Sequence, residues 1–173
     1  CVTDEIVNIA GYRFVDLPDR DELREPFKSS CDEVGLLGTI LLSYEGINFF
    51  LSGKQSAIDH FLRYLESDKR FQGIPLKMSY SNRMSFRRMN VRLKNEIISL
   101  GLDSIRPAES TGESITPQEF KTWLDQGREI IVLDTRNDYE VRLGTFEGAI
   151  DLDLSTFRAF PDAVAESEID KNQ

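Results

Sequence analysis

The stretch that decides the expected fold of the second half of the chain is residues 129–151, EIIVLDTRNDYEVRLGTFEGAID. Four consecutive apolar residues, Ile130 to Leu133, are typical of a strand that is buried on both faces. Such strands occur mainly in parallel sheets that carry helices on each side. We expect this strand to end at Asp134, so the stretch predicts part of an α/β domain.

The residues that follow the predicted strand have a recognisable spacing. Arg136 and Glu140 lie four residues apart, which is the spacing of an ion pair on one helical turn. Gly144 and Gly148 then bracket a tight return into a second apolar run. A strand end, a helical turn and a glycine-flanked loop are therefore expected in this order.

The first 97 residues alternate between strand and helix signals. The predicted order is strand (5–15), helix (21–34), strand (39–43), strand (47–51), helix (55–66) and strand (75–80). This order is that of the ferredoxin-like split βαβ fold. Pro26 lies past the first helical turn, so we expect its helix to begin late or to bend. Gly46 is expected to supply the positive φ of a hairpin turn, and Met89 to Lys94 either extends the sheet or forms an arm beside it.

A linker and a second domain follow in the sequence. Residues 98–114 hold two Gly, one Pro and four Ser, which indicates a linker between residues 1–97 and 115–173. Thr116-Pro117-Gln118-Glu119 predicts a helix start with a capping box, and Gly127 its end. Phe120, Trp123 and Leu124 are expected to form the buried stripe of this helix. A doubly wound sheet needs about five strands, so the second domain is expected to be incomplete.

Composition indicates a soluble globular protein. The chain has 173 residues, of which 40% are hydrophobic and 29% are charged. No apolar run approaches the roughly 18 residues that span a bilayer, so we expect no membrane association. Cys1-Val-Thr-Asp-Glu lacks the features of a signal peptide. Two distant cysteines favour a reducing, cytoplasmic setting, and we expect no metal or other cofactor.

Charge is distributed unevenly along the chain. Residues 1–94 carry 14 Lys and Arg against 13 Asp and Glu, whereas residues 95–173 carry 7 against 17. Residues 69–95 hold eight basic residues and no acidic one. An acidic chain with one basic stretch predicts a polyanion site that is confined to that surface.

Several motifs resemble those of one family. The matching segments in the first half are Asn8-Ile-Ala, Gly38-Thr-Ile-Leu-Leu, Glu45-Gly-Ile-Asn48, Phe86-Arg-Arg-Met89, Val91-Arg-Leu-Lys94 and Glu96-Ile-Ile. Those in the second half are Leu133-Asp-Thr-Arg-Asn137, Tyr139-Glu-Val141, Gly144-Thr-Phe-Glu-Gly-Ala-Ile150 and Phe160-Pro161. In these segments the chain resembles the rhodanese-like tRNA uridine hydroxylases. The resemblance implies an acylphosphatase-like, ferredoxin-like α+β domain followed by an incomplete α/β rhodanese domain.

The resemblance also implies a reaction. Members of the family hydroxylate the wobble uridine of tRNA at C5, with molecular oxygen as co-substrate, in the cytoplasm. Their rhodanese domain carries a cysteine in a C-x-G-G-x-R-C loop, whose backbone N–H groups and Arg lower the thiol pKa. Neither Cys1 nor Cys31 lies in such a loop. We therefore expect the complete protein to be the enzyme and this chain alone to be inactive.

Two groups of residues are candidates for a functional site. The candidates for tRNA binding are Arg83, Arg87, Arg88, Arg92, Lys94, Tyr80 and Phe86, in which the basic side chains would neutralise phosphates and the two rings would stack an unpaired base. The alternative is a solvated sheet face. Asp134, Arg136 and Glu140 match the D-x-R-x-x-x-E motif of rhodaneses. They would brace the loop structurally, although the end of a parallel strand is also where α/β ligands bind.

Two other functions stay open. The rhodanese scaffold equally supports a sulfurtransferase that carries a cysteine persulfide. A chain without the cysteine loop could also be a non-catalytic RNA-binding adaptor.

Overall fold

The computed structural model describes residues 5–97, 112–167 and 169. Internal contacts divide the chain into two compact units, whose described parts are residues 5–97 and residues 112 onward. Of the predicted linker, only residues 112–114 are among the described residues, and Cys1 is not. Among the helices described in these ranges, none is both long and apolar enough to cross a membrane.

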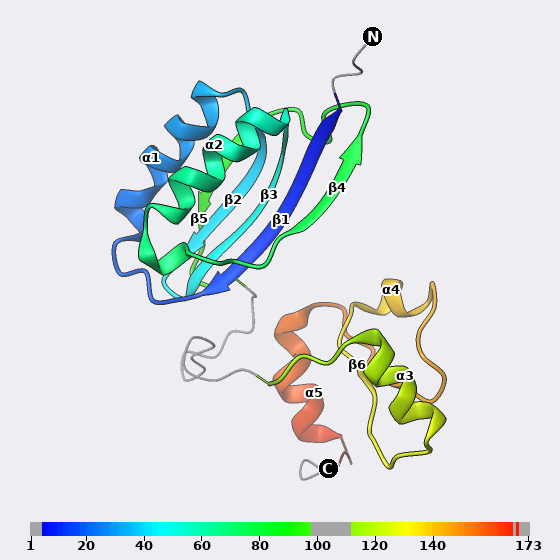
Figure 1. Cartoon of the computed structure of the whole chain (residues 1–173). Coiled ribbons are helices and arrows are strands. Elements are labelled where there is room, and N and C mark those ends of the chain that lie inside the picture. Colours follow the sequence, from blue (N-terminus) through cyan, green and yellow to red (C-terminus); the bar gives the residue numbers. More distant parts are fainter. Residues whose placement is uncertain (1–4, 98–111, 168, 170–173) are drawn as a thin grey trace. The chain divides into compact units, whose positions relative to one another are not determined.

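The first unit consists of a five-stranded sheet with two helices on one face (Figure 1). Its strands are β1 (Ile6–Phe14), β2 (Leu37–Ser43), β3 (Gly46–Gly53), β4 (Lys77–Ser81) and β5 (Met89–Leu93). Its helices are α1 (Arg20–Glu33), α2 (Gln55–Glu66) and the short 3-10 helix η1 (Lys69–Phe71). The strand order is β4-β1-β3-β2-β5, and β3 pairs antiparallel with both β1 and β2. The predicted ferredoxin-like fold is therefore confirmed for this unit.

The fifth strand extends the sheet. β5 pairs in parallel with β2, with Ile40 opposite Val91 and Leu41 opposite Arg92. Of the two arrangements that the sequence left open for Met89 to Lys94, the structure has the extended sheet. Arg24 of α1 fastens this edge, because its Nε donates to the Val91 carbonyl oxygen at 3.2 Å.

The two faces of the sheet have different roles. Because side chains alternate along a strand, every second residue points toward the helices. On that side Phe49 packs edge-on against Phe61 of α2 with ring centroids 5.4 Å apart, and both rings are fully buried. We call the opposite side the open face. Its central residues are Asn8, Ala10 and Tyr12 of β1, Thr39 and Leu41 of β2, and Asn48, Phe50 and Ser52 of β3.

Helix α1 begins at Arg20 and continues through Pro26 to Glu33, so of the two expectations for Pro26, a late start or a bend, the late start is wrong. A proline at this position removes the bond to the Glu22 carbonyl. Both residues are exposed, so water can satisfy that carbonyl. Burial of Phe27 and Cys31 on the other side of the helix holds it in place.

The second unit is small, and most of its regular secondary structure is helical. Its elements are α3 (Pro117–Asp125), β6 (Leu133–Asp134), α4 (Asp138–Val141), β7 (Ile150–Asp151), η2 (Phe157–Ala159) and α5 (Phe160–Glu166). The predicted capping box is present, since Thr116 Oγ1 accepts from the Glu119 N–H at 3.2 Å and the Glu119 carboxylate accepts from the Thr116 N–H at 2.8 Å. Gly127 ends α3 with a φ of +62°, as predicted.

The predicted strand from Ile130 to Leu133 is largely wrong. Only Leu133 and Asp134 form β6, which pairs in parallel with β7, and residues 130–133 are half-buried. The predicted buried stripe of α3 is also wrong, because Leu124 is exposed while Phe120 and Trp123 are half-buried. Two strands of two residues each offer too little sheet surface to bury a strand on both faces or a helix on one.

Candidate nucleic-acid interface and rhodanese-motif loop

The segment that joins β4 to β5 crosses the open face. The two strands are consecutive in the chain but lie at opposite edges of the sheet. Ser85 Oγ donates to Asn8 Oδ1 of β1 at 2.8 Å, and the Ser85 N–H donates to Ser52 Oγ of β3 at 3.3 Å. Both acceptors belong to the open face, which fixes the side on which the chain crosses. We call residues 82–88 the crossing segment.

The crossing segment and its continuation carry most of the predicted tRNA-binding residues. Arg83, Arg87 and Arg88 are exposed on it, and Phe86 is half-buried. Arg92 is exposed on β5, where it lies beside Leu41 of the open face. Lys94 is exposed two residues further on, and its N–H extends the ladder by donating to the Leu42 carbonyl at 2.8 Å. Alternation therefore assigns both basic residues of this edge to one face.

These basic side chains are available for an external partner. Within the described ranges, neither the three arginines of the crossing segment nor Arg92 nor Lys94 forms an ion pair. Arg70 differs, although it belongs to the same basic stretch of the sequence. Its guanidinium binds Asp19 at 2.6 Å and Asp68 at 2.7 Å. These hydrogen bonds hold the pKa of both carboxyl groups below their usual range, so Arg70 stabilises the fold and adds no net charge to the surface.

The two predicted stacking residues are placed differently. Tyr80 is 58% exposed on the edge strand β4 and lies opposite Val7, whose side chain is buried on the helix side. Directly opposed residues share a face, so Tyr80 belongs to the helix side of the sheet. Phe86 lines a cavity of about 430 Å³ between the crossing segment and the open face. Tyr80 is among the β4 residues that border this cavity, although alternation directs its side chain to the helix side. Phe50 of the open face also lines this cavity, and the sequence did not lead us to predict it. Alternation with Phe49 and Leu51 was the signal that could have revealed it.

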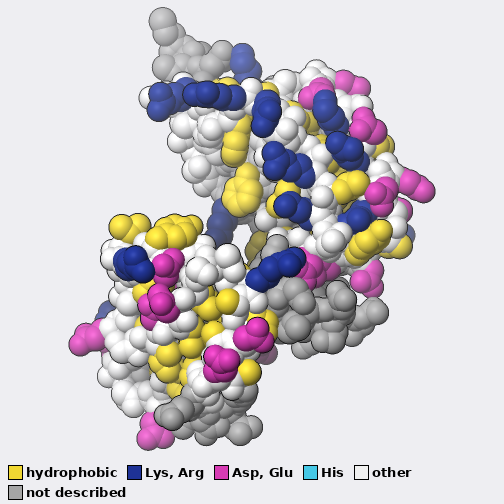
Figure 2. Space-filling model, turned by 180° about the vertical axis from the view of Figure 1, so that it is seen from behind, with side chains coloured by type: hydrophobic (Ala, Val, Ile, Leu, Met, Phe, Trp, Pro, Cys, Tyr) yellow, Lys and Arg dark blue, Asp and Glu magenta, His cyan; other side chains and the backbone are white. Residues whose placement is uncertain are grey.

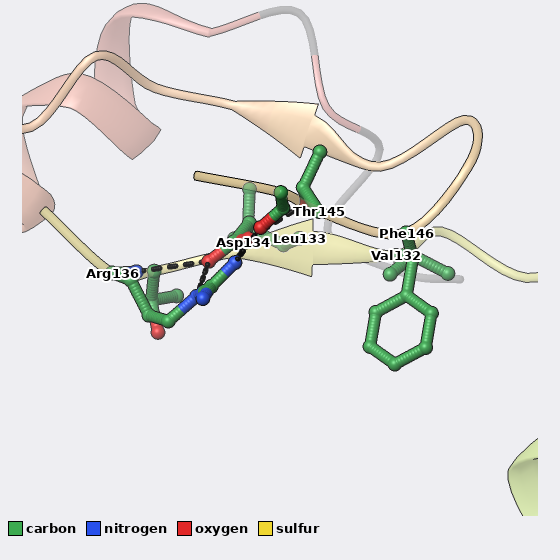
Figure 3. A pocket seen from close by; sticks show the side chains of 8 residues that line it. Val132, Leu133, Asp134, Arg136, Thr145 and Phe146 are labelled. Carbon is green, nitrogen blue, oxygen red and sulfur yellow. Dashed lines mark hydrogen bonds and ion pairs between the residues drawn. The ribbon is translucent and has the colours of Figure 1, made fainter. Parts of the chain in front are cut away.

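Asp134 and Arg136 of the rhodanese motif form one compact hydrogen-bonded group with Thr145 (Figure 3). Arg136 Nε and Nη2 donate to the two oxygens of Asp134 at 3.0 and 2.7 Å. Thr145 Oγ1 donates to Asp134 Oδ2 at 2.7 Å, and Arg136 Nη2 also donates to the Gly144 carbonyl at 2.7 Å. Arg136 first, and then Thr145, lower the pKa of Asp134 well below its ordinary value. The end of β6 is thereby tied to the loop before β7, beside a cavity of about 520 Å³.

The predicted ion pair between Arg136 and Glu140 is not present. Arg136 lies before α4, not on it, and its guanidinium is taken by Asp134. The Glu140 carboxylate instead accepts from the Asn137 N–H at 3.2 Å, as the second half of a capping box. Glu140 therefore starts the helical turn and Arg136 braces the strand end.

Comparison with known proteins places the chain in a family. Residues 6–97 match the family described as UPF0176 acylphosphatase like domain. The "tRNA uridine(34) hydroxylase" of Bordetella avium is 48% identical over 166 residues, which cover 93% of this chain and 69% of that protein. The chain belongs to the tRNA uridine(34) hydroxylase family.

Other members of the family are longer than this chain. The "tRNA uridine(34) hydroxylase" proteins of Cupriavidus necator and Cupriavidus taiwanensis are 49% and 47% identical to it. The matches cover 93% and 96% of this chain but only 59% and 61% of those relatives. The chain therefore spans about three fifths of the length of these members of the family.

Cys31 is poorly suited to thiol chemistry in this family member. The side chain is fully buried on α1, and burial raises its pKa to about 12. A thiol with that pKa is almost entirely protonated at neutral pH, whereas the thiolate is the nucleophile. The structure thus supports a packing role for Cys31. Within the described residues, no three His, Cys, Asp or Glu side chains are grouped to hold a metal ion.

Proposed function

We propose that this chain is part of an enzyme that hydroxylates the wobble uridine of tRNA at C5, with molecular oxygen as co-substrate, in the cytoplasm. The observation that carries the proposal is the 44–49% identity, over nearly the whole chain, to proteins named tRNA uridine(34) hydroxylase. The acid-free, basic crossing segment of the first unit supports it, because a tRNA substrate presents closely spaced phosphates.

The two parts of the chain have different roles in this proposal. Residues 1–97 hold the tRNA, residues 98–114 link the parts, and residues 115–173 are the N-terminal part of a rhodanese domain. Arg83, Arg87, Arg88, Arg92 and Lys94 contact phosphates, and the cavity beside Phe86 takes a base. Asp134, Arg136 and Glu140 keep the motif loop in shape. The reacting thiol belongs to the longer protein, so this chain alone is inactive.

Nucleoside analysis of a deletion strain tests the reaction. Mass spectrometry of bulk tRNA from a strain that lacks the complete gene should show loss of 5-hydroxyuridine and of nucleosides made from it. The complete gene should restore them, and a gene for residues 1–173 alone should not. Loss of thiolated nucleosides with 5-hydroxyuridine intact would establish the sulfurtransferase instead. If neither class of nucleoside changes, both reactions are refuted and the RNA-binding adaptor is the remaining function.

A further inference from the structure

Phe50 is an exposed aromatic residue in the middle of a sheet. It lies on β3, the central strand, and its side chain is 50% exposed. Its neighbours across the two adjacent strands are Ala10 and Thr39. Because these two side chains are small, they leave the ring of Phe50 uncovered on the open face. A large apolar side chain in such a place has no packing role that accounts for it.

Tyr12 continues this aromatic surface along β1. Its side chain is 59% exposed and lies opposite Asn48, so it is the diagonal neighbour of Phe50 on the same face. Residues in that relation have their Cα atoms roughly 7–8 Å apart, within reach of aromatic side chains. Phe14 packs edge-on against Tyr12 with ring centroids 5.7 Å apart, which supports the Tyr12 ring from one side. The exposed rings of Phe50 and Tyr12 therefore lie next to each other on the open face.

The cavity beside Phe50 has polar groups at its rim. Asn8, Ser81 and Ser85 form a chain of hydrogen bonds of 2.8 to 3.0 Å that holds the crossing segment against the sheet. The same three residues line the cavity together with Phe50 and Phe86. An aromatic wall with a few fixed amide and hydroxyl groups is the composition of a site for a flat, polar ring.

The charge of this face suits a polyanion. None of the five strands contains an aspartate or a glutamate. Lys77 lies opposite Ala10 on the open face, and Arg87 and Arg92 lie on or beside it. Figure 2 shows Lys, Arg and hydrophobic side chains over the middle of the first unit, with Asp and Glu side chains toward its edge. Aromatic rings among unpaired basic groups are typical of surfaces that bind single-stranded nucleic acid.

We propose that the open face is a stacking platform for unpaired nucleotides of the tRNA anticodon loop. One base stacks on Phe50 inside the cavity, its neighbour stacks on Tyr12, and the phosphates of this segment of the loop face Lys77 and the arginines. The anticodon loop is the expected ligand because the wobble position lies in this unpaired loop. This inference therefore rests on the proposed function. An open antiparallel sheet that stacks bases on its aromatic side chains is a recurrent solution for RNA.

Binding of two RNA probes to the 173-residue chain tests the platform. The probes are a fluorescent anticodon stem-loop and a blunt duplex of similar length, measured by anisotropy at one salt concentration. Phe50→Ala should weaken stem-loop binding by roughly tenfold to a hundredfold, as expected for the loss of one stacked base, and leave duplex binding unchanged. Phe50→Trp, which keeps an aromatic ring at this position, should bind the stem-loop with wild-type affinity. Tyr139→Ala, which removes an exposed ring from the second unit (60% exposed, against 50% for Phe50), is the matched control and should have no effect.

A crosslinking measurement needs no variant and guards against misfolding. A stem-loop with a photoreactive thiouridine in the loop should crosslink to the tryptic peptide that contains Phe50 and ends at Lys54. Wild-type stem-loop affinity in Phe50→Ala, or an equal loss for duplex and stem-loop, would overturn the platform and leave the proposed function intact. Absence of any stem-loop binding by the wild-type chain would overturn both.

Discussion

Gly46 shows how a single residue fixes the geometry of the hairpin between β2 and β3. It follows the Tyr44–Glu45 turn with a φ of +148°, a backbone conformation that side chains with a Cβ rarely adopt. A Cβ built at this position would lie 2.0 Å from the carbonyl oxygen of Arg13 on β1. The glycine therefore allows both the turn and the close approach of two strands.

Gly46→Ala is expected to destabilise the first unit by roughly 2–4 kcal/mol, from backbone strain together with overpacking. Gly73→Ala is the matched control, because Gly73 also has a positive φ, of +67°, but has no atom within 4 Å of a Cβ. It should cost about 1 kcal/mol, from the backbone conformation alone. Urea unfolding followed by circular dichroism measures both. Equal destabilisation by the two substitutions would show that the close approach to Arg13 has no influence.

At the scale of elements, local signals predicted what local interactions determine. The start and end of α3 were predicted correctly, because the capping box of Thr116 and the positive φ of Gly127 involve only neighbouring residues. The strand expected at Ile130 to Leu133 was not predicted correctly, because an apolar run becomes a buried strand only where other strands cover it. The β6–β7 pair supplies one neighbour of two residues.

The candidate RNA site likewise combines residues that local sequence signals revealed with features that depend on the tertiary fold. The basic residues were found from the sequence, because a run without acidic residues is visible there. The crossing segment could not be predicted, since its path depends on β4 and β5 lying at opposite edges of the sheet. Phe50 was overlooked because residues 47–51 were assigned only as a strand, although alternation with the buried Phe49 turns Phe50 outward.

Arg136→Ala is expected to loosen the second unit and to leave RNA affinity unchanged. Arg136 joins the Asp134 carboxylate at the end of β6 to the Gly144 carbonyl, whereas Thr145 ties the same loop to Asp134 through a single hydrogen bond. Trp123, the single tryptophan, lies in α3 and reports unfolding of this unit by fluorescence. The urea midpoint should fall more than for Arg142→Ala, which removes the ion pair between an exposed arginine and Asp138. A loss of RNA affinity with an unchanged midpoint would instead show that Arg136 binds the ligand directly.

At the scale of the molecule, charge is segregated within the first unit. The acidic residues of its two long helices are Asp21, Glu22, Glu25, Asp32 and Glu33 of α1, and Asp59 and Glu66 of α2. The strands and the crossing segment carry none. The whole chain has a net charge of −9, which opposes the approach of RNA. At physiological ionic strength this repulsion is screened beyond roughly 8 Å, so binding depends on the charge of the face that touches the RNA.

Reversal of two charges on that face is expected to weaken tRNA binding and to flatten its salt dependence. Arg87→Glu with Arg88→Glu should lower affinity by about tenfold or more and reduce the slope of log K against log salt by about two, because each arginine neutralises one phosphate. Arg63→Glu with Lys69→Glu makes the same change in net charge on α2 and η1, on the helix side. This control should retain the wild-type slope, because its charges lie away from the open face. Binding isotherms over a salt series decide between the two surfaces. If both double variants flatten the slope equally, net charge and not the crossing segment governs binding, and the assignment of the interface to the open face is wrong.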